Sequence, residues 1–415
     1  MNIQLHKSTT NQESTIKITG SKSESNRLLL LQALYSNIEI ENLSNSDDTL
    51  VMKEALSTSS NSIDVHHAGT AMRFLSAYFA SQKGREVVLT GSDRMKERPI
   101  KILVDALKTL GADISYLEAE GFPPLKINGK SLTKNKVTLK ANVSSQYISA
   151  LLLIAPKLEN GLELTLEGNI TSIPYINMTL ALLNEVGIKT SFIDNVIKVE
   201  QQSTINKQKS MVESDWSSAS YFYSIVALGD VGTEISLSSY NEDSLQGDSV
   251  LADIYQQFGV KTSFQENRII LQKLALNETE RSSINQQSLI QLDLSHAPDI
   301  AQTIAVTCFA LGLECSLKGL HTLKIKETDR LLALKIEIEK LGGQVSITED
   351  SLTLKASKLI KSQVAIDTYN DHRMAMAFAP LALRTSLIIN DAEVVSKSYP
   401  DFWSDLKSIG FQISE

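Results

Sequence analysis

A glycine that follows an amphipathic helix and precedes a short strand recurs along the chain, and this repeat constrains the fold more than any other feature. The five copies are Leu110-Gly111-Ala112, Val186-Gly187-Ile188, Phe258-Gly259-Val260, Leu341-Gly342-Gly343 and Ile409-Gly410-Phe411. Successive glycines lie 76, 72, 83 and 68 residues apart, a period too long for a solenoid repeat but suited to a whole α/β subdomain. We expect each glycine to be left-handed and to close its helix.

The repeat predicts two similar domains, with three copies on each side of about residue 210. A sixth copy is expected near Ala55–Val65, where the sequence shows only a polar connector. That copy is therefore predicted to be truncated. The stretch Gln201–Ser214 is polar and precedes a helix expected at Trp216, so it is the predicted linker.

Composition narrows the class of protein. The chain has 415 residues, 42% of them hydrophobic, which is enough for two ordinary cores. A net charge of −8 argues against a nucleic-acid partner. Apolar runs are too short to cross a membrane, and Met1–Thr10 lacks a signal-peptide core, so a cytoplasmic protein is expected. Cys308 and Cys315 lack metal or redox spacing and are predicted to be buried, inert thiols.

The segment Lys326–Arg330 places a lysine, two carboxylates and an arginine at a predicted helix start. The periodic segment Leu331–Leu341 follows, so Thr328 or Asp329 is expected to cap the helix. Exposed N–H groups there favour an anion. Glu327 is explained only if it neutralises the cations or handles a proton. For this segment alone, a solvated helix start is the alternative interpretation.

Similar residues occur at other predicted helix starts. These segments are Gly20–Arg27 before Leu28–Leu34, Ala68–Arg73, Arg94–Pro99, Ser144–Gln146 before Tyr147–Ala155, Asp371–Arg373 before Met374–Leu383, and Lys397–Asp401 before Phe402–Ile409. Pro99 suits a first helical position, which would place Arg98 at the helix N-terminus. Basic groups gathered at helix starts on an acidic chain predict a site for a small anionic ligand.

Five motifs, in order, resemble the EPSP synthase family over essentially the whole chain. They are Gly20-Ser21-Lys22-Ser23-Glu24-Ser25-Asn26-Arg27, Ala68-Gly69-Thr70-Ala71-Met72-Arg73, Arg94-Met95-Lys96-Glu97-Arg98-Pro99, Lys326-Glu327-Thr328-Asp329-Arg330 and Asp371-His372-Arg373-Met374-Ala375-Met376. The resemblance implies an α/β fold of two similar inverse α/β barrel domains, built from about six βαβαββ-type repeats with the first truncated. The domains would be residues 1–19 plus 211–415 and residues 20–210, with the active site in the cleft between them.

The implied reaction moves the enolpyruvyl group of phosphoenolpyruvate to the 5-hydroxyl of shikimate 3-phosphate and releases phosphate. The resemblance implies small-molecule substrates, no metal or organic cofactor, no nucleic acid, no membrane, and a monomer. Each substrate carries a phosphate and a carboxylate, so the site must compensate several buried negative charges. Arginine suits planar anions that need a two-pronged donor, and lysine acts as a point charge.

The resemblance assigns residues to both substrates. Those implied for phosphoenolpyruvate are Lys22, Gly69, Arg98, Gln146, Arg330, Arg373 and Lys397. Those implied for shikimate 3-phosphate are Lys22, Ser23, Arg27, Ser144, Ser145, Gln146, Ser172, Tyr175, Asp299, Thr322 and Lys326.

Addition followed by elimination needs two proton-handling groups in opposite states. Glu327 is expected to protonate the methylene carbon of phosphoenolpyruvate and to recover that proton, and Asp299 is expected to take the hydroxyl proton. Lys22 and Lys326 would stabilise developing charge, with His372 as a proton carrier near the phosphate. For Asp299 taken alone, a simple helix N-cap is the alternative interpretation.

Some positions depart from the family pattern. His67 stands where asparagine is common, Ile173 stands where lysine is common, and Thr322-Leu323 replaces an Asn-Trp pair. The Thr322 side chain is shorter than asparagine and has less reach toward shikimate 3-phosphate.

Two rival functions stay open at this stage. One is the enolpyruvyl transferase that acts on UDP-N-acetylglucosamine, which carries a loop cysteine in the region that here reads Ser92–Pro99, without cysteine. The other is a catalytically silent anion-binding homologue, against which the retention of both Glu327 and Asp299 argues.

Overall fold

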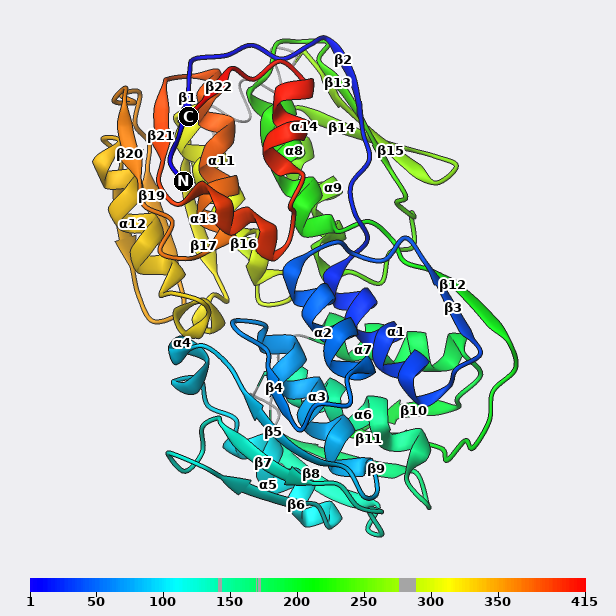
Figure 1. Ribbon diagram of the computed structural model, residues 1–415. Coiled ribbons are helices and arrows are strands. Elements are labelled where there is room, and N and C mark those ends of the chain that lie inside the picture. The colour runs from blue at the N-terminus through cyan, green and yellow to red at the C-terminus, as the bar shows by residue number, and fades with distance from the viewer. Residues whose placement is uncertain (141–143, 169, 171–172, 276–288) are drawn as a thin grey trace. The chain divides into compact units, whose positions relative to one another are not determined.

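The computed structural model describes residues 1–140, 144–168, 170, 173–275 and 289–415, and it shows a mixed α/β chain (Figure 1). The chain divides into two compact units. Unit 1 comprises Met1–Thr19 and Glu213–Glu415, and unit 2 comprises Gly20–Val212. The boundary near the predicted linker lies after residue 212, whereas the sequence placed it after residue 210.

Unit 2 alternates helices with short strands. Its elements are α1 (Lys22–Leu34), β3 (Ile38–Glu41), α2 (Asp47–Ser57), β4 (Ser62–Asp64), α3 (Gly69–Ser81), β5 (Glu86–Thr90), α4 (Asp93–Lys96), α5 (Lys101–Leu110), β6 (Asp113–Tyr116), β7 (Leu125–Asn128), β8 (Lys136–Lys140), α6 (Ser145–Ile154), η1 (Ala155–Lys157), β9 (Leu162–Glu167), α7 (Ile173–Glu185), β10 (Thr190–Ile193), β11 (Val196–Val199) and β12 (Gln208–Met211).

Unit 1 follows the same alternation. Its elements are β1 (Ile3–Leu5), β2 (Glu13–Ile16), α8 (Trp216–Leu228), β13 (Glu234–Ser238), η2 (Gly247–Val250), α9 (Leu251–Ile254), η3 (Tyr255–Phe258), β14 (Val260–Gln265), β15 (Arg268–Lys273), β16 (Leu289–Asp293), η4 (Pro298–Ile300), α11 (Ala301–Leu311), β17 (Glu314–Lys318), η5 (His321–Ile325), α12 (Arg330–Lys340), β18 (Gln344–Ile347), β19 (Leu352–Lys355), β20 (Val364–Ile366), α13 (His372–Phe378), η6 (Ala379–Leu383), β21 (Leu387–Ile389), η7 (Ala392–Lys397), α14 (Phe402–Ser408) and β22 (Ile413–Ser414).

In the part of the chain that the structure describes, five four-stranded sheets share one topology, which confirms the repeat predicted from the glycines. In the sheet β4-β5-β7-β6, the first two strands are parallel and the other two pairings are antiparallel. The same pattern holds for β8-β9-β11-β10, β2-β13-β15-β14, β16-β17-β19-β18 and β20-β21-β1-β22. In the sheet β20-β21-β1-β22, the third strand is β1, from the N-terminal part of the chain. In the other four sheets, the third strand follows the second strand in sequence. The N-terminal residues therefore complete the final repeat.

The sixth copy is truncated, as predicted. Among the described residues, its sheet has two strands, β12 and β3, which pair in parallel. Between α2 and β4 there is no antiparallel strand pair; the chain instead passes through a connector at Thr58–Asn61. The guanidinium of Arg85 donates hydrogen bonds to the carbonyls of Thr58, Ser59 and Ser60. These bonds satisfy backbone groups that a strand would otherwise pair.

The five repeat glycines end or directly follow their helices with positive φ, between 75° and 111°, at Gly111, Gly187, Gly259, Gly342 and Gly410. An L side chain is strained in this region, whereas glycine is not. The predicted left-handed closure is therefore confirmed at all five positions.

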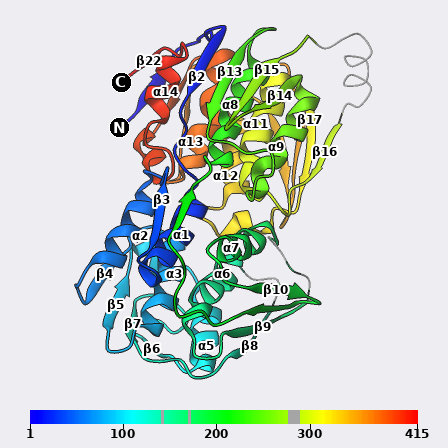
Figure 2. The ribbon, with the colours of Figure 1, turned by 90° about the vertical axis from the view of Figure 1, so that its right-hand side faces the viewer.

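The core of unit 1 lies among three helices that are buried around almost their whole circumference. Helix α11 contacts both α8 and α13 (Figure 2), and buried side chains on these helices include Trp216, Phe309 and Phe378. Their sequences are apolar on every face, which is the pattern of a central helix. Cys308 and Cys315 are free and buried in this core, as predicted. None of the described helices has the length and apolarity that a membrane span requires.

Candidate active site

In unit 1, three carboxylates converge on one buried guanidinium, that of Arg330. This side chain is only 2% exposed. Its Nη1 donates to Asp299 Oδ1 at 2.8 Å, its Nη2 to Glu327 Oε2 at 2.8 Å, and its Nε to Asp371 Oδ2 at 2.6 Å. Burial opposes the charge, but the three carboxylates outweigh it and raise the pKa of Arg330. The two groups predicted to move protons are thus held by one cation.

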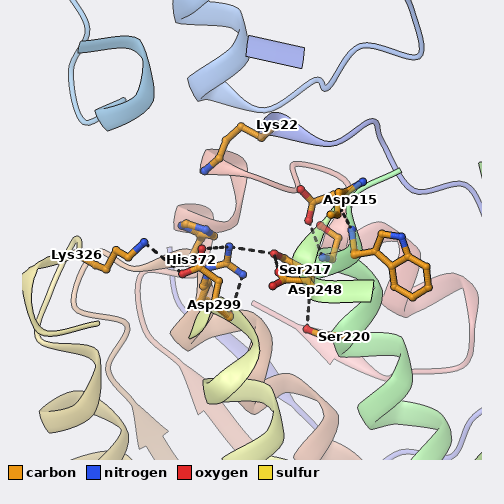
Figure 3. A network of polar contacts seen from close by, with 12 residues as sticks. Lys22, Asp215, Ser217, Ser220, Asp248, Asp299, Lys326 and His372 are labelled. Atoms are coloured by element: carbon orange, nitrogen blue, oxygen red, sulfur yellow. Dashed lines mark hydrogen bonds and ion pairs between the residues drawn. The ribbon is translucent and has the colours of Figure 1, made fainter. Parts of the chain in front are cut away.

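Three cationic side chains lie within 4 Å of the carboxylate of Asp299. Besides Arg330, its carboxylate lies 3.5 Å from Lys326 Nζ and 3.5 Å from Arg373 Nη2 (Figure 3). Burial by itself would raise the pKa of Asp299, but Lys326, Arg373 and Arg330 together outweigh it and hold that pKa well below its usual range. Ala297 occupies the N-cap position of η4 without a side-chain bond. The alternative interpretation of Asp299 as a helix cap is therefore wrong.

The start of α12 is built as the sequence predicted. Asp329 is the N-cap, and its Oδ1 accepts from the backbone N–H groups of Leu331 and Leu332, both at 3.1 Å. Lys326 and Glu327 precede the first turn and face Asp299 and Arg330, respectively. Burial lowers the pKa of Lys326, although the carboxylate of Asp299 partly restores it. The cap therefore orients both a cation and a carboxylate toward Asp299 and Arg330.

The start of α13 supplies further residues to the cluster of charged side chains around Arg330. Asp371 caps this helix by accepting from the backbone N–H of Arg373 at 2.9 Å while it also binds Arg330. His372 and Arg373 are both buried. Lys397 Nζ donates to the carbonyl of Asn370 at 2.6 Å, beside the same helix start. Arg330, Arg373, Lys326 and Lys397 thus gather around two neighbouring helix N-termini within unit 1.

Thr322 lies in η5, immediately before this cluster. Its Oγ1 is buried and has no hydrogen-bond partner among the residues that the structure describes. The role of Thr322 in ligand binding therefore stays a prediction.

In unit 2, Lys22 is the first residue of α1 and lies 3.5 Å from Asp48 Oδ2 in the first turn of α2. The helix begins six residues earlier than the expected start at Leu28. Ser21 caps it by accepting from the backbone N–H of Glu24, and this serine-to-glutamate spacing favours a helix start. The polar motif therefore lies within the helix instead of ahead of it.

Arg27 lies inside unit 2 and is largely occupied by internal contacts. It donates to Thr179 Oγ1 at 2.8 Å, Ser149 Oγ at 3.0 Å, and the carbonyls of Ser23 at 2.8 Å and Tyr175 at 3.3 Å. Burial lowers its pKa to about 10. These bonds tie α1 to α6 and α7, so Arg27 holds Ser23 and Tyr175 in place whether or not it touches a ligand.

Gly69 and Arg98 approach each other closely at the start of α3. A Cβ on Gly69 would lie 2.7 Å from Arg98 Nη1 and 3.0 Å from Nη2. Gln146, in the first turn of α6, donates to Thr70 Oγ1 at 3.1 Å. The structure therefore brings Gly69, Arg98 and Gln146 together. Glycine at position 69 leaves the space that the guanidinium fills.

Pro99 is not at the first position of a helix, so that prediction is wrong. Helix α5 begins at Lys101 with Ile100 as its N-cap, and Arg98 lies in the connection after α4. The carbonyl of Pro99 instead accepts from the hydroxyl of Tyr147 and from Arg73 Nη2. These tertiary contacts override the local preference of proline for a first helical turn.

The remaining predicted residues of unit 2 lie at or near the starts of α6 and α7. Ser144 caps α6 through a bond from the backbone N–H of Gln146. Ser144 is exposed and Ser145 is buried. Tyr175 lies in the first turn of α7. Ser172 lies outside the described residues.

Sequence reasoning missed three acidic residues of these sets. Asp48 pairs with Lys22, Asp371 binds Arg330, and Asp248 contacts Ser217 next to Arg373. Only Asp371 carried a signal, as part of a predicted cap, and its pairing depends on tertiary structure. Within the described part of the chain, no group of three or more His, Cys, Asp and Glu side chains is placed to hold a metal ion.

Residues 54–406 match the sequence model of EPSP synthase (3-phosphoshikimate 1-carboxyvinyltransferase). The chain belongs to the EPSP synthase family. It is 47% identical over 406 residues to a 3-phosphoshikimate 1-carboxyvinyltransferase of Bacteroides fragilis, covering 97% of this chain and 96% of the relative. A Haemophilus influenzae protein of the same name is 37% identical over 431 residues, covering 96% of each. The resemblance inferred from the five motifs is confirmed.

Solved structures support the α/β fold. An EPSP synthase from Acinetobacter baumannii superposes with a TM-score of 0.80 at 20% identity, covering 100% of both chains. The enolpyruvyl transferase NikO from Streptomyces tendae superposes with a TM-score of 0.74 at 13% identity, covering 100% of this chain and 98% of that one. At these identities the superpositions concern the fold alone.

Proposed function

We propose that the chain transfers the enolpyruvyl group of phosphoenolpyruvate to the 5-hydroxyl of shikimate 3-phosphate and releases phosphate. One observation carries the proposal: Asp299 and Glu327 bind different nitrogens of the same buried guanidinium, Arg330. Two carboxylates fixed this way can serve the two proton transfers of an addition followed by an elimination. Family membership supports the same reaction.

Asp299 is the proposed base for the 5-hydroxyl. The cations around it keep it ionised, so it can accept a proton. Lys326 lies beside it and would stabilise the oxygen from which the proton leaves. Glu327 would deliver a proton to the methylene carbon of phosphoenolpyruvate and take one back from the resulting methyl group during elimination. His372 is buried and directly precedes Arg373 in the sequence. It is the proposed proton carrier near the departing phosphate.

The cations of both units would hold the anionic groups of the substrates. In unit 1, we assign Arg373, Lys397 and Arg330 to phosphoenolpyruvate. The Nε, Nη1 and Nη2 atoms of Arg330 already donate to carboxylates. Because a guanidinium has five N–H donors, the ligand would share Arg330 with these carboxylates. The assignments in unit 2 are Lys22, Gly69, Arg98 and Gln146 for phosphoenolpyruvate, and Lys22, Ser23, Arg27, Ser144, Ser145, Gln146, Ser172 and Tyr175 for shikimate 3-phosphate.

The proposal requires the two sets to act on the same pair of substrates, with Thr322, Asp299 and Lys326 reaching shikimate 3-phosphate from unit 1. We further propose that the chain works as a monomer in the cytoplasm. The free, buried thiols of Cys308 and Cys315 are in keeping with a reducing compartment.

The rival functions are less well supported. The segment Ser92–Pro99 contains no cysteine, and the two cysteines of the chain are buried in unit 1. A loop thiol of the kind carried by the UDP-N-acetylglucosamine enzyme is therefore not present at that position. A silent anion-binding protein would gain nothing from holding Asp299 and Glu327 next to its anion-binding cations.

A phosphate-release assay tests the proposal. Purified chain is mixed with phosphoenolpyruvate and either shikimate 3-phosphate or UDP-N-acetylglucosamine. We expect phosphate release only with shikimate 3-phosphate. Release that depends on the UDP-sugar would establish the rival transferase, and no release with either acceptor would favour the silent homologue.

A further inference from the structure

The carboxyl group of Asp248 is buried near Arg373 and has no role in the reaction described above. Asp248 lies in η2 and is 4% exposed. Its Oδ2 contacts the hydroxyl of Ser217 in the first turn of α8. Its Oδ1 is buried without a hydrogen-bond partner among the described residues. A carboxylate with one oxygen unsatisfied in the interior is costly when charged, so this group requires an explanation.

Ser217 links Asp248 to Arg373 through two hydrogen bonds whose donors and acceptors can be assigned. Arg373 Nη2 donates to Ser217 Oγ at 3.2 Å, and a guanidinium can only donate. The hydroxyl hydrogen of Ser217 is therefore directed at Asp248 Oδ2. On its other side, Arg373 donates to the carbonyl of Asp299 at 3.2 Å and lies 3.5 Å from its carboxylate. Figure 3 shows Asp248, Ser217 and Asp299 in this connected network.

Asp248 can change charge near neutral pH. Burial raises its pKa to about 7, the nearby charge of Asp299 and that of Asp215 add to the rise, and Arg373 and the bond from Ser217 oppose it. Other ionisable groups lie near Asp248 or Arg373, and the charges of Lys326 and Arg330 also act on Arg373. Asp299 is held ionised by its cations, burial keeps the hydroxyl of Tyr221 protonated, Asp215 caps α8 through Ser218, and His372 precedes Arg373.

We propose that Asp248 is a positioning residue that takes up a proton when an anion binds Arg373. The incoming negative charge adds to that of Asp299, and the ligand competes with Ser217 for the N–H groups of Arg373. Both effects disfavour the charged form of Asp248. A neutral Asp248 in turn leaves the positive charge of Arg373 available to the ligand. This inference rests on the proposed function, because it takes the anion to be phosphoenolpyruvate.

Proton uptake by Asp248 on ligand binding predicts how the KM for phosphoenolpyruvate changes with pH. Binding that takes up a proton weakens as pH rises above the pKa of the free group, by up to about tenfold per pH unit. With Asp248 titrating near pH 7, the KM for phosphoenolpyruvate should therefore rise from pH 7 toward pH 9. Other groups, the ligand among them, can change charge over this pH range, so only the difference between wild type and a variant isolates Asp248.

The test compares Asp248→Asn with wild type, measuring the KM for phosphoenolpyruvate from pH 6.5 to 9 at saturating shikimate 3-phosphate. Asp253→Asn on α9 makes the same change at an exposed position and serves as the matched control. We expect the ratio of wild-type KM to Asp248→Asn KM to increase up to about tenfold per pH unit above pH 7. Asp253→Asn should follow the wild-type profile throughout.

Ser217→Ala provides a second variant if Asp248→Asn does not fold. Losing the bond to ionised Asp248 raises the pKa of that carboxyl further, so the rise in KM should move to higher pH. Parallel profiles for wild type and a folded, active Asp248→Asn, or an unmoved profile for Ser217→Ala, would overturn the coupling alone. A wild-type chain that releases no phosphate with both substrates would instead count against the proposed function.

Discussion

The guanidinium of Arg330 and the carboxylate of Asp371 form a buried ion pair, with 2.6 Å between Nε and Oδ2. Asp371 is also the N-cap of α13, and Arg330 is the first residue of α12. The pair therefore locks two helix starts together. Because Arg330 also binds Asp299 and Glu327, this contact helps to position both proposed proton-transfer groups.

Replacing Arg330 with methionine should destabilise the chain as well as inactivate it. The change leaves three carboxylates without their shared cation, and removing one partner of a buried charge pair costs about 3–5 kcal/mol. Urea unfolding measures the loss. The exposed Arg94, which pairs with Glu97 on the surface, offers a control: Arg94→Met should change stability by less than about 1 kcal/mol. Equal effects from the two substitutions would contradict the central role of Arg330.

Gly69→Ala should weaken the binding of phosphoenolpyruvate while the chain stays folded. The new methyl group would lie 2.7 Å from Arg98 Nη1, and this flexible side-chain end can move away at little cost. We expect KM to rise by about tenfold and kcat to change less, because the displaced group is proposed to bind and not to react. Combining Gly69→Ala with Arg98→Lys should add little to either change alone. Full additivity would show that the two residues act independently.

The chain should lose stability in acid partly through Asp299. Its pKa in the folded protein lies below the unfolded value near 4, so the folded state binds fewer protons than the unfolded state in acid. The stabilisation is therefore complete above about pH 4 and disappears as the pH falls through the folded pKa. Denaturant unfolding should show the largest gap between wild type and Asp299→Asn near neutral pH. A gap that stays constant down to pH 2 would be inconsistent with an ionised, paired Asp299.

Thiol reagents should leave the activity intact. Contact with Cys315, together with burial, raises the pKa of the Cys308 thiol well above its usual value, and protonated thiols react slowly. Alkylation at neutral pH, followed by the phosphate-release assay, should therefore give an unchanged rate. Rapid inactivation that phosphoenolpyruvate prevents would place a cysteine at the reacting centre and reverse the choice between the two transferases.

Local signals in the sequence predicted the features that depend on a few neighbouring residues. The left-handed glycines and the caps by Asp329, Ser144 and Asp371 follow from side chains bonding to backbone groups within one helical turn. The truncated copy could be recognised because a polar connector stands where Gly and a strand recur elsewhere. These features could be predicted because they depend on residues that are close together in the sequence.

Tertiary contacts explain what the sequence did not predict. The carbonyl of Pro99 binds Tyr147, 48 residues away, and no local preference of proline anticipates that bond. Arg330 was assigned to a ligand alone, whereas Asp299 and Asp371, distant in sequence, also bind it. Asp248 has no motif around it, and its significance arises only from burial beside Ser217 and Arg373.

Turnover of Glu327→Gln tests the central claim most directly. The amide keeps the size and polarity of the side chain but removes the transferable proton, so we expect normal substrate binding and a loss of phosphate release of about 10²-fold or more. Glu339→Gln, at an exposed position of α12, the helix that follows Glu327, should retain the wild-type rate. Phosphate release by Glu327→Gln within a fewfold of wild type would contradict the assignment of Glu327 and the two-carboxylate account built on it.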